Sequence, residues 1–336
     1  MNERDAKAGP YEKAIRAEAV SKTFGPTVAL DKVSFEVEKG ELFGFIGPDG
    51  GGKTTLFRIL VSLLIPESGR ATVIGLDVVR DFRALRQRVG YMAGRFSLYP
   101  DLTVEENLTF FASVFGTTIE REYAQIKPIY AQLEPFRTRH AGALSGGMKQ
   151  KLALCCALVH RPEVLFLDEP TTGVDAVSRR EFWDLLGVLK QGGLTTVVST
   201  PYMDEATRCD RIALMHGGKL LGLDAPSGII AAFDRPLLGV RAGQRYKALL
   251  ALRKYEHAHS AYPFGDVLHY TDTRTDLPVE RIGADVKQFL DARGFTDASV
   301  CPLTPSVEDS FIARTELDPG SPMTDPRSRL PGHSHE

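Results

Sequence analysis

The sequence predicts an α/β fold built on a buried parallel sheet, and two kinds of segment support this prediction. Short apolar runs suited to buried strands occur at residues 42–46, 164–167 and 195–199. Apolar residues recur at helical spacing over residues 56–63, after the first run, and over residues 182–189, after the second. Buried strands that alternate with amphipathic helices are typical of domains whose strands run parallel.

The loop between the first strand and its helix fits the pattern G-x-x-x-x-G-K-[ST]. Its glycines let backbone N–H groups curve round an anion, and the new helix directs free amides and its positive dipole end at phosphates. We expect Lys53 to reach the β- and γ-phosphates and the Thr54 hydroxyl to ligate Mg²⁺. A glycine-rich turn that happens to precede a helix is the alternative, and the complete pattern disfavours it. The loop, here called the phosphate cradle, consists of Gly47, Pro48, Asp49, Gly50, Gly51, Gly52, Lys53, Thr54 and Thr55.

Two carboxylates, Asp168 and Glu169, end the apolar run that begins at residue 164. The carboxyl ends of parallel strands are where open α/β sheets bind ligands. We expect Asp168 to hold Mg²⁺ and Glu169 to orient or deprotonate an attacking water. A strand that ends in acids is common by chance, but it is less common downstream of a complete cradle.

Two other features are candidate ligand contacts. Ser145, followed by Gly146 and Gly147, opens a helix and offers a second exposed anion site. Taken alone, such a sequence is an ordinary helix cap. Phe24 precedes the cradle, where an aromatic ring can stack on a nucleotide base, although an isolated phenylalanine is more often a core residue.

Composition limits the classes of partner. The 336 residues are 43% hydrophobic and 25% charged, enough for one large domain and a smaller one. The net charge of −2 gives no overall basic field for nucleic acid. Residues 1–11 are polar, and no window reaches the ~18 apolar residues of a spanning helix, so we expect a cytoplasmic chain without a nucleic-acid partner. The four cysteines have no metal-site spacing and are predicted to be core thiols: Cys155, Cys156, Cys209 and Cys301.

Four parts are expected along the chain. They are a flexible N-terminus at 1–13, a large cradle-bearing domain at 14–235, a small α+β domain at 236–316 and a disordered tail at 317–336. In the large domain, residues 14–24 are predicted as an edge strand of an antiparallel subdomain, and residues 119–133 as a helix kinked or broken at Pro128. In the small domain, strands are predicted at 237–241, 267–270 and 298–301, and helices at 244–255 and 279–293.

Four elements in this order resemble the nucleotide-binding subunit of an ABC transporter. They are the cradle, residues 144–150, residues 165–170 and Val174-Asp175. The second element, spelled L-S-G-G-M-K-Q, is the specific one, because many unrelated P-loop proteins have the cradle and the acids without it. The resemblance covers roughly residues 14–230. Short segments within it, such as Y-M-D-E-A, are similar to the corresponding segments of drug-efflux exporter subunits. It implies a P-loop NTPase fold with an antiparallel β-subdomain, a helical signature subdomain and a small C-terminal α+β appendage.

The resemblance also implies a mechanism and partners. Two such domains meet head to tail, either as a homodimer or with a different ATP-binding domain, and each ATP lies between one cradle and the other chain's Ser145, Gly146 and Gly147. Phe24 becomes the aromatic that stacks on adenine, and Asp175 lies in the loop that links the two sites. ATP hydrolysis then powers export of a drug-like or lipid-like substrate through an integral membrane subunit, with this chain at the inner face of the cell membrane.

An aromatic loop, residues 94–100, becomes the contact for a cytoplasmic helix of that membrane subunit, with Phe96 and Tyr99 as anchors. The alternative is a loop that tucks its aromatic side chains into its own core.

Two positions depart from the family pattern. Gly94 stands where the family has a glutamine, after Ala93 in place of a proline, and Pro201 stands where it has a histidine. A single catalytic donor or acid–base group is typically worth ~10²–10³ in rate. One hypothesis is a degenerate, mainly ATP-holding cradle in an asymmetric pair. The other is a homodimer in which Arg95 or Tyr202 substitutes.

Two rival functions remain within the family. A soluble ABC ATPase that acts on ribosomes or DNA usually has two cassettes in one chain or a long coiled-coil insertion. This chain has one cassette, and residues 94–144 are too few for a long coiled coil. An importer subunit is disfavoured by the exporter-like segments and by the type of C-terminal appendage.

Overall fold

The computed structural model describes residues 13–94 and 98–316. The chain divides into two compact units, one holding Met1–Pro226 with Arg314–Glu336 and the other Ser227–Ala313. The sequence places this boundary after residue 235, whereas the structure assigns helix α7, Pro226–Ala231, almost wholly to the second unit. The expected disordered tail and nearly all of the expected flexible N-terminus lie outside the described residues. None of the helices in the described ranges is long and apolar enough to cross a membrane.

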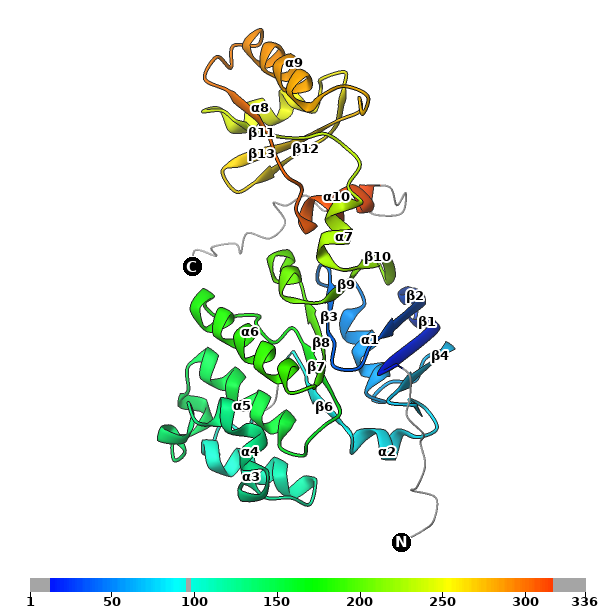
Figure 1. The fold of residues 1–336 in the computed structure, drawn as a ribbon, viewed down its shortest axis with the longest axis vertical. Helices are drawn as coiled ribbons and strands as arrows, with labels where there is room; N and C mark the ends of the chain where they lie inside the picture. The colour runs from blue at the N-terminus through cyan, green and yellow to red at the C-terminus, as the bar shows by residue number, and fades with distance from the viewer. Residues whose placement is uncertain (1–12, 95–97, 317–336) are drawn as a thin grey trace. The chain divides into compact units, whose positions relative to one another are not determined.

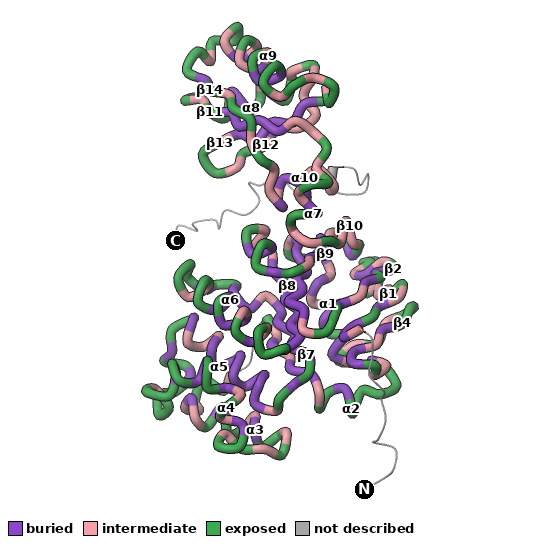
Figure 2. The backbone as a smooth tube through the Cα atoms, viewed as in Figure 1, coloured by how far each residue is buried: buried purple, intermediate pink, exposed green. Residues whose placement is uncertain are grey.

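A six-stranded sheet forms the centre of the first unit, in the order β10-β9-β3-β8-β7-β6 (Figure 1). All neighbouring pairs are parallel except β10 with β9, so the predicted α/β class is confirmed. The strands β3, β7 and β8 are buried at every residue, as Figure 2 shows for β7 and β8, because helices cover both faces of a parallel sheet. The bounds are β3 Leu42–Ile46, β6 Val89–Met92, β7 Val164–Asp168, β8 Thr195–Thr200, β9 Arg211–His216 and β10 Lys219–Asp224.

An antiparallel sheet in the order β2-β1-β4-β5 lies beside helix α1, Lys53–Leu60. Its first strand, β1, pairs with both β2 and β4, so the predicted edge strand is an interior strand. The prediction was wrong because β4 follows helix α1 in the chain, and no local pattern indicates pairing at that separation. The bounds are β1 Ile15–Phe24, β2 Thr27–Val37, β4 Ser68–Val73 and β5 Leu76–Asp77.

Three helices form a separate layer of this unit, in which α5 packs against both α3 and α4 (Figure 1). They are α3 Val104–Val114, α4 Ile119–Tyr130 and α5 Gly146–Leu158, and the short α2, Phe82–Arg86, precedes β6. Helix α4 continues through Pro128 and ends two residues later. A proline in the last turn removes only one hydrogen bond of the helix. The helix is therefore not broken at Pro128 and ends at Tyr130, before the predicted end at residue 133.

A series of phenylalanine rings ties the cradle helix to both sheets. Phe35 of β2 meets Phe45 of β3 with ring centroids 4.9 Å apart, and Phe45 meets Phe57 of α1 at 5.8 Å. Phe57 in turn meets Phe166 of β7 at 5.8 Å. The edge-to-face geometry of these contacts adds to the hydrophobic burial. The series fixes α1 against the strand that delivers Asp168.

The second unit is an α+β domain with the strand order β12-β13-β11-β14. The sequence analysis predicts neither β12 nor α10. Strand β12 is not predicted because its residues, A-H-S-A-Y-P-F, show no alternation of apolar and polar residues and include a proline. Cys301 lies on the edge strand β14 and is exposed, so the core prediction was wrong for this thiol, although the other three cysteines are buried. The bounds are β11 Leu237–Arg241, α8 Arg245–Leu252, β12 Ala258–Phe264, β13 Val267–Asp272, α9 Val279–Asp291, β14 Ser299–Pro302 and α10 Val307–Glu316.

Asp309 joins α10 to the sheet of this unit. Its Oδ1 contacts Nδ1 of His269 at 2.6 Å and accepts a hydrogen bond of 2.5 Å from the Tyr262 hydroxyl. Its Oδ2 accepts from the amide and the hydroxyl of Ser306. Burial alone would raise the pKa of Asp309, but the hydrogen bonds from His269, Ser306 and Tyr262 outweigh it and lower the pKa to about 2.

We predict that Asp309→Asn lowers the free energy of unfolding of the chain by about 2 kcal/mol, because an amide at this buried position leaves at least one of the donors unpaired. The folded pKa lies below the ordinary 3.8, so the stabilisation is present above about pH 4 and is lost as the pH falls toward 2. Urea unfolding at pH 7 and pH 3 measures both effects. An equal difference between wild type and variant at the two pH values would contradict this account.

Candidate nucleotide-binding site

The cradle loop has a backbone conformation and surroundings that require glycine. Gly52 begins helix α1 with φ at 100°, and a Cβ atom there would lie 2.4 Å from the carbonyl oxygen of Ala29. A Cβ atom at Gly47 would lie 2.0 Å from the carbonyl oxygen of Met215. The Gly47 amide also donates to the carbonyl of Thr200 at 3.2 Å, which joins the loop to the end of β8. The loop is therefore fixed between β2, β8 and β9.

Lys53 is buried, with its ammonium group at the mouth of this loop. Its Nζ donates to the carbonyl oxygens of Gly47 at 2.8 Å and Pro48 at 2.9 Å. The same atom lies 3.4 Å from Oε1 of Glu169. A buried cation beside glycines that exclude any Cβ atom fits an anionic phosphate group.

The two acids at the end of β7 differ in environment. Asp168 is buried, and its Oδ1 accepts a hydrogen bond of 2.6 Å from the Ser199 hydroxyl. The Tyr91 hydroxyl donates to Oδ2 at 3.5 Å, and burial first, then the Asp168 charge, raises the pKa of Tyr91 to about 12. Tyr91 therefore stays a neutral donor at physiological pH.

Glu169 leaves the strand through a left-handed turn. Its φ is 51°, a conformation that costs a non-glycine residue about 1–3 kcal/mol. The Glu169 amide donates to both the carbonyl and the hydroxyl oxygen of Ser199, each at 3.0 Å. This turn places the Glu169 carboxylate beside Lys53, while Asp168 keeps its place in the sheet.

The structure thus brings together Lys53, Asp168 and Glu169, three of the residues that the sequence singled out. Within the described residues, no group of three or more His, Cys, Asp or Glu side chains could hold a metal ion. The Thr54 hydroxyl and the Asp168 carboxylate are nevertheless the hard oxygen ligands that Mg²⁺ prefers, with phosphate oxygens and water as the usual remaining ligands. The donor set therefore fits a magnesium ion that arrives with a nucleotide.

Ser145 and Gly146 are exposed at the start of α5, where Ser145 accepts a hydrogen bond from the Met148 amide at 3.3 Å. Gly147 is buried against α6, Ala176–Gln191, and a Cβ atom there would lie 2.6 Å from the Ser178 hydroxyl oxygen. Asp175 caps α6 by accepting hydrogen bonds from the Val177 and Ser178 amides, and the Ser178 amide is the main cause of its lowered pKa. The segment at residues 145–147 therefore packs against the first turn of α6.

Phe24 is half exposed at the end of β1, with 50% of its surface accessible. The Lys22 ammonium lies 5.6 Å from the ring centroid. The core alternative for this side chain is wrong, because the hairpin turn at Gly25 carries it away from the sheet interior. Its ring is accessible for stacking.

Both positions that depart from the family pattern border the two acids or the cradle. A Cβ atom at Gly94 would lie 3.1 Å from the carbonyl oxygen of Asp168 and 3.9 Å from Cβ of Glu169. Pro201 follows Thr200, whose carbonyl holds the Gly47 amide. Arg95 and Phe96 lie outside the described residues.

Four polar side chains near the acids have no role that a local sequence pattern predicts: Tyr91, Thr171, Ser199 and Glu205. Ser199 and Thr171 belong to apolar or turn segments whose pattern assigns them no role. Glu205 belongs to the segment Y-M-D-E-A, which resembles exporter subunits but assigns this residue no function.

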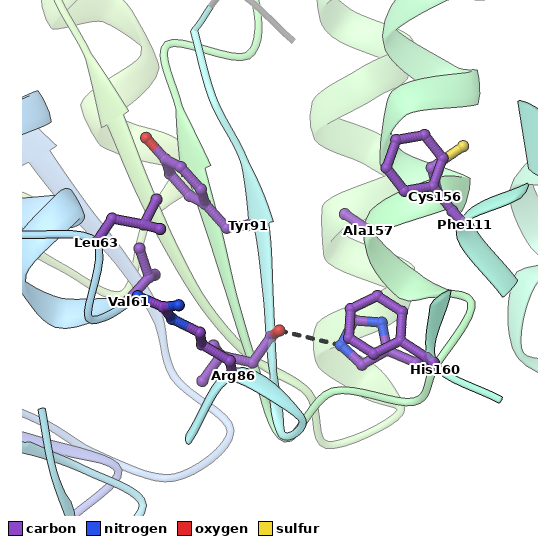
Figure 3. Close-up of a pocket in the computed structure, with 10 residues that line it drawn as sticks. Val61, Leu63, Arg86, Tyr91, Phe111, Cys156, Ala157 and His160 are labelled. Carbon is purple, nitrogen blue, oxygen red and sulfur yellow. Dashed lines mark hydrogen bonds between the residues drawn. The ribbon is translucent and has the colours of Figure 1, made fainter. Parts of the chain in front are cut away.

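A cavity of about 230 Å³ lies apart from the cradle, between the end of α1, strand β6 and helices α3 and α5 (Figure 3). Its apolar walls include Val61, Leu63 and Phe111. His160 stacks on Phe115 with ring centroids 3.7 Å apart, and its Nε2 lies 3.0 Å from the Val89 carbonyl oxygen. Burial lowers the pKa of His160, so this side chain stays uncharged at neutral pH, and Arg86 is the charged lining residue of the cavity.

Tyr99 of the aromatic loop reaches the wall of this cavity through two rings. Tyr99 meets Phe110 at 4.9 Å, and Phe110 meets Phe111 at 5.5 Å. Tyr99 and Phe110 are 45% and 39% exposed, so these rings are not tucked into a core.

We predict that Gly147→Ala destabilises the chain by about 1–3 kcal/mol, because its methyl group would overlap Ser178. Gly146→Ala is the matched control, since a Cβ atom there meets only the Gly173 carbonyl oxygen at 3.8 Å. Thermal unfolding measures the difference, and Ser178→Gly should relieve the Gly147→Ala effect. Equal unfolding temperatures for the two alanine variants would refute this packing.

Comparisons with known proteins agree with this geometry. The family model described as ABC transporter matches residues 30–172. The probable multidrug ABC transporter ATP-binding protein YbhF of Escherichia coli (strain K12) is 45% identical over 227 residues, which are 66% of this chain and 39% of that protein. The chain thus spans less than half the length of this relative. The daunorubicin resistance ATP-binding protein DrrA2 of Streptomyces coeruleorubidus is 34% identical over 309 residues, 90% of this chain and 95% of that protein.

The solved structure of CbiO1 from Clostridium perfringens, described as part of the ABC transporter complex CbiONQ, superposes with a TM-score of 0.59. It covers 66% of this chain and 92% of that one at 24% identity. This likeness shows the fold.

Proposed function

Since the chain belongs to the ATP-binding protein family of ABC transporters, we propose that it binds and hydrolyses ATP to drive export through a separate integral membrane subunit. The observation that carries this proposal is the meeting of Lys53 and Glu169, 3.4 Å apart, at a loop in which Gly47 and Gly52 leave no room for a Cβ atom. The names of the relatives in Escherichia coli and Streptomyces coeruleorubidus, multidrug and daunorubicin resistance, favour a drug-like molecule as the exported substrate.

Each site residue has a role in this proposal. The cradle amides and Lys53 hold the phosphates of ATP, and the exposed ring of Phe24 stacks on adenine. Thr54 and Asp168 ligate Mg²⁺, which supplies charge stabilisation at the phosphates when it is bound. Glu169 orients a water molecule or accepts its proton, because its turn directs the carboxylate toward the cradle.

A second ATP-binding domain completes the site in this proposal. Ser145 and Gly146 are exposed at a helix start, a place that suits an anion. We expect head-to-tail pairing, in which these residues face the ATP held by the other domain's cradle. The partner domain is a second copy of this chain or a different family member.

In the same proposal, ATP bound at the cradle of this chain is hydrolysed slowly. Gly94 and Pro201 offer no side chain that could hold water or a phosphate oxygen, although both border the site. The pairing is then asymmetric, with a competent site formed by the partner's cradle and this chain's Ser145.

We predict that the purified chain alone binds ATP tightly and turns it over slowly, and that Pro201→His raises the turnover by about 10²-fold. Gly94→Gln should raise it less, because its Cβ atom is only 3.1 Å from the Asp168 carbonyl oxygen and the backbone must shift. Steady-state ATPase assays with Mg²⁺ measure both. Robust turnover of the unmodified chain, abolished by Glu169→Gln, would rule out the degenerate cradle and favour a homodimer.

The apolar cavity beside β6 suits a cytoplasmic helix of the membrane subunit. Its walls are mostly apolar, with Arg86 as the charged lining residue, and the exposed Tyr99 and Phe110 connect to them through Phe111. Docking there connects the partner to the strand that ends beside Asp168. It also places the chain at the inner face of the cell membrane.

We predict that Leu63→Asp abolishes co-purification of the chain with an integral membrane protein from the cells that produce it, because a carboxylate in the cavity loses its water. The Kd for ATP should stay within about twofold, since Leu63 lies outside the cradle. Val188→Asp is the control, an equally exposed apolar position on α6. Recovery of ribosomes or DNA in place of a membrane protein would overturn the transport role.

A further inference from the structure

Glu205 is a buried residue whose carboxylate contacts side chains from three segments near the candidate nucleotide-binding site. We propose that Glu205 is a positioning residue that fixes the turn carrying Glu169 relative to the turn at Pro201. The inference rests on the proposed ATP hydrolysis for its effect on rate, but its structural part can be tested without hydrolysis.

The carboxylate holds two hydroxyl groups from different elements. Its Oε1 accepts a hydrogen bond of 2.8 Å from Thr171, and its Oε2 accepts one of 2.5 Å from Thr200. Glu205, Thr171 and Thr200 are 3%, 1% and 0% exposed, so water does not replace either contact. Hydrogen bonds to a charged acceptor are stronger than those between neutral groups.

Thr171 belongs to the turn that follows the catalytic candidate. The amide of Thr172 donates to the Glu169 carbonyl at 3.2 Å, and the amide of Val174 donates to the Thr171 carbonyl at 3.2 Å. The position of Thr171 therefore sets how the chain leaves Glu169. Because Glu169 has a left-handed φ of 51°, its turn depends on support from outside its own backbone.

Thr200 is the last residue of β8 and has contacts on both sides of Pro201. Its carbonyl accepts the Gly47 amide at 3.2 Å, and its hydroxyl accepts the Tyr202 amide at 3.1 Å. Pro201 itself has neither an N–H group nor a side-chain donor. The turn at Pro201 is thus held through its neighbour Thr200, and Thr200 is held by Glu205.

Arg179 of α6 balances the charge of this carboxylate. Its Nε lies 3.7 Å from Oε1 of Glu205, and its guanidinium carbon lies 4.1 Å from the ring centroid of Tyr202. Helix α6 also carries Ser178, which packs on Gly147. One buried carboxylate therefore connects the turn after Glu169, the turn at Pro201 and the helix that supports the segment at residues 145–147.

The size of the expected effect follows from geometry. A misplacement of about 1 Å at a reacting group costs about 10²-fold in rate. Replacing Glu205 removes no contact of the cradle glycines: Gly47 and Gly52 keep their close backbone approaches to β9 and β2, and the Thr200 carbonyl that accepts the Gly47 amide belongs to a residue that is also paired with β3. The change should therefore appear in the rate of hydrolysis and much less in ATP affinity.

The test compares Glu205→Gln and Glu205→Ala in the full chain with a matched control, Glu41→Gln. Glu41 is also buried, and its carboxylate accepts hydrogen bonds from Arg211 at 2.7 and 2.9 Å, but it lies before β3 and away from both turns. Thr171→Val and Thr200→Val each remove one hydroxyl group at constant shape. Three quantities are measured: the single-turnover rate with radiolabelled ATP, the Kd for ATP, and hydrogen exchange of residues 169–175 and 199–205.

We expect the single-turnover rate to fall about tenfold in Glu205→Gln and about 10²-fold in Glu205→Ala, with the Kd for ATP changed less than about threefold. Hydrogen exchange should quicken together in both segments. Each valine variant should quicken exchange in both segments as well, because the carboxylate joins them. Glu41→Gln should lower thermal stability without any of these effects.

An unchanged rate and unchanged exchange in the Glu205 variants would overturn the proposal. A loss of ATP affinity parallel to the loss of rate, or the same changes in Glu41→Gln, would also overturn it, because both indicate general destabilisation. If the wild-type chain neither bound nor hydrolysed ATP, the proposed function would fail instead, and hydrogen exchange would still decide whether Glu205 joins the two turns.

Discussion

The close approach of the cradle loop to β9 is the constraint on which the rest of the site depends. A Cβ atom at Gly47 would lie 2.0 Å from the Met215 carbonyl oxygen, and one at Gly52 would lie 2.4 Å from that of Ala29. Contacts this short exclude every side chain, so the loop can lie between its neighbouring strands only with glycine at these positions. The approach sets where α1 begins and directs Lys53 back toward the loop carbonyls.

The acids face this loop because of two further physical features. The phenylalanine series from Phe35 to Phe166 holds α1 against β7, and the pairing of β7 with β8 places Ser199 where it can bind Asp168 and the Glu169 amide. The left-handed turn at Glu169 then sends that side chain toward Lys53. The backbone strain of this turn persists because Ser199 and, in our proposal, the Glu205 contacts support it.

Particular residues show how far sequence reasoning reached. The cradle, the two acids and the helix start at Ser145 could be predicted, because each has a local pattern of residue types at fixed spacing. Phe24 was ambiguous, since burial depends on where a hairpin turns and not on the residue itself. The edge assignment of β1 was wrong because its partner β4 follows an entire helix. Cys301 was assigned to the core, although it lies on the edge strand β14.

By itself, the sequence determined the α/β class, the phosphate cradle and the order of the elements along the chain, because glycine patterns and apolar periodicity act over a few residues. The tertiary structure alone decided which strands are neighbours, that Gly94 borders Asp168, and that Glu205 joins Thr171 to Thr200. The approach of Gly94 to Asp168 and the hydrogen bond from Thr171 to Glu205 bring together residues 74 and 34 positions apart in the chain, and their formation depends on the burial of the whole sheet. Local residue propensities do not predict these long-range contacts.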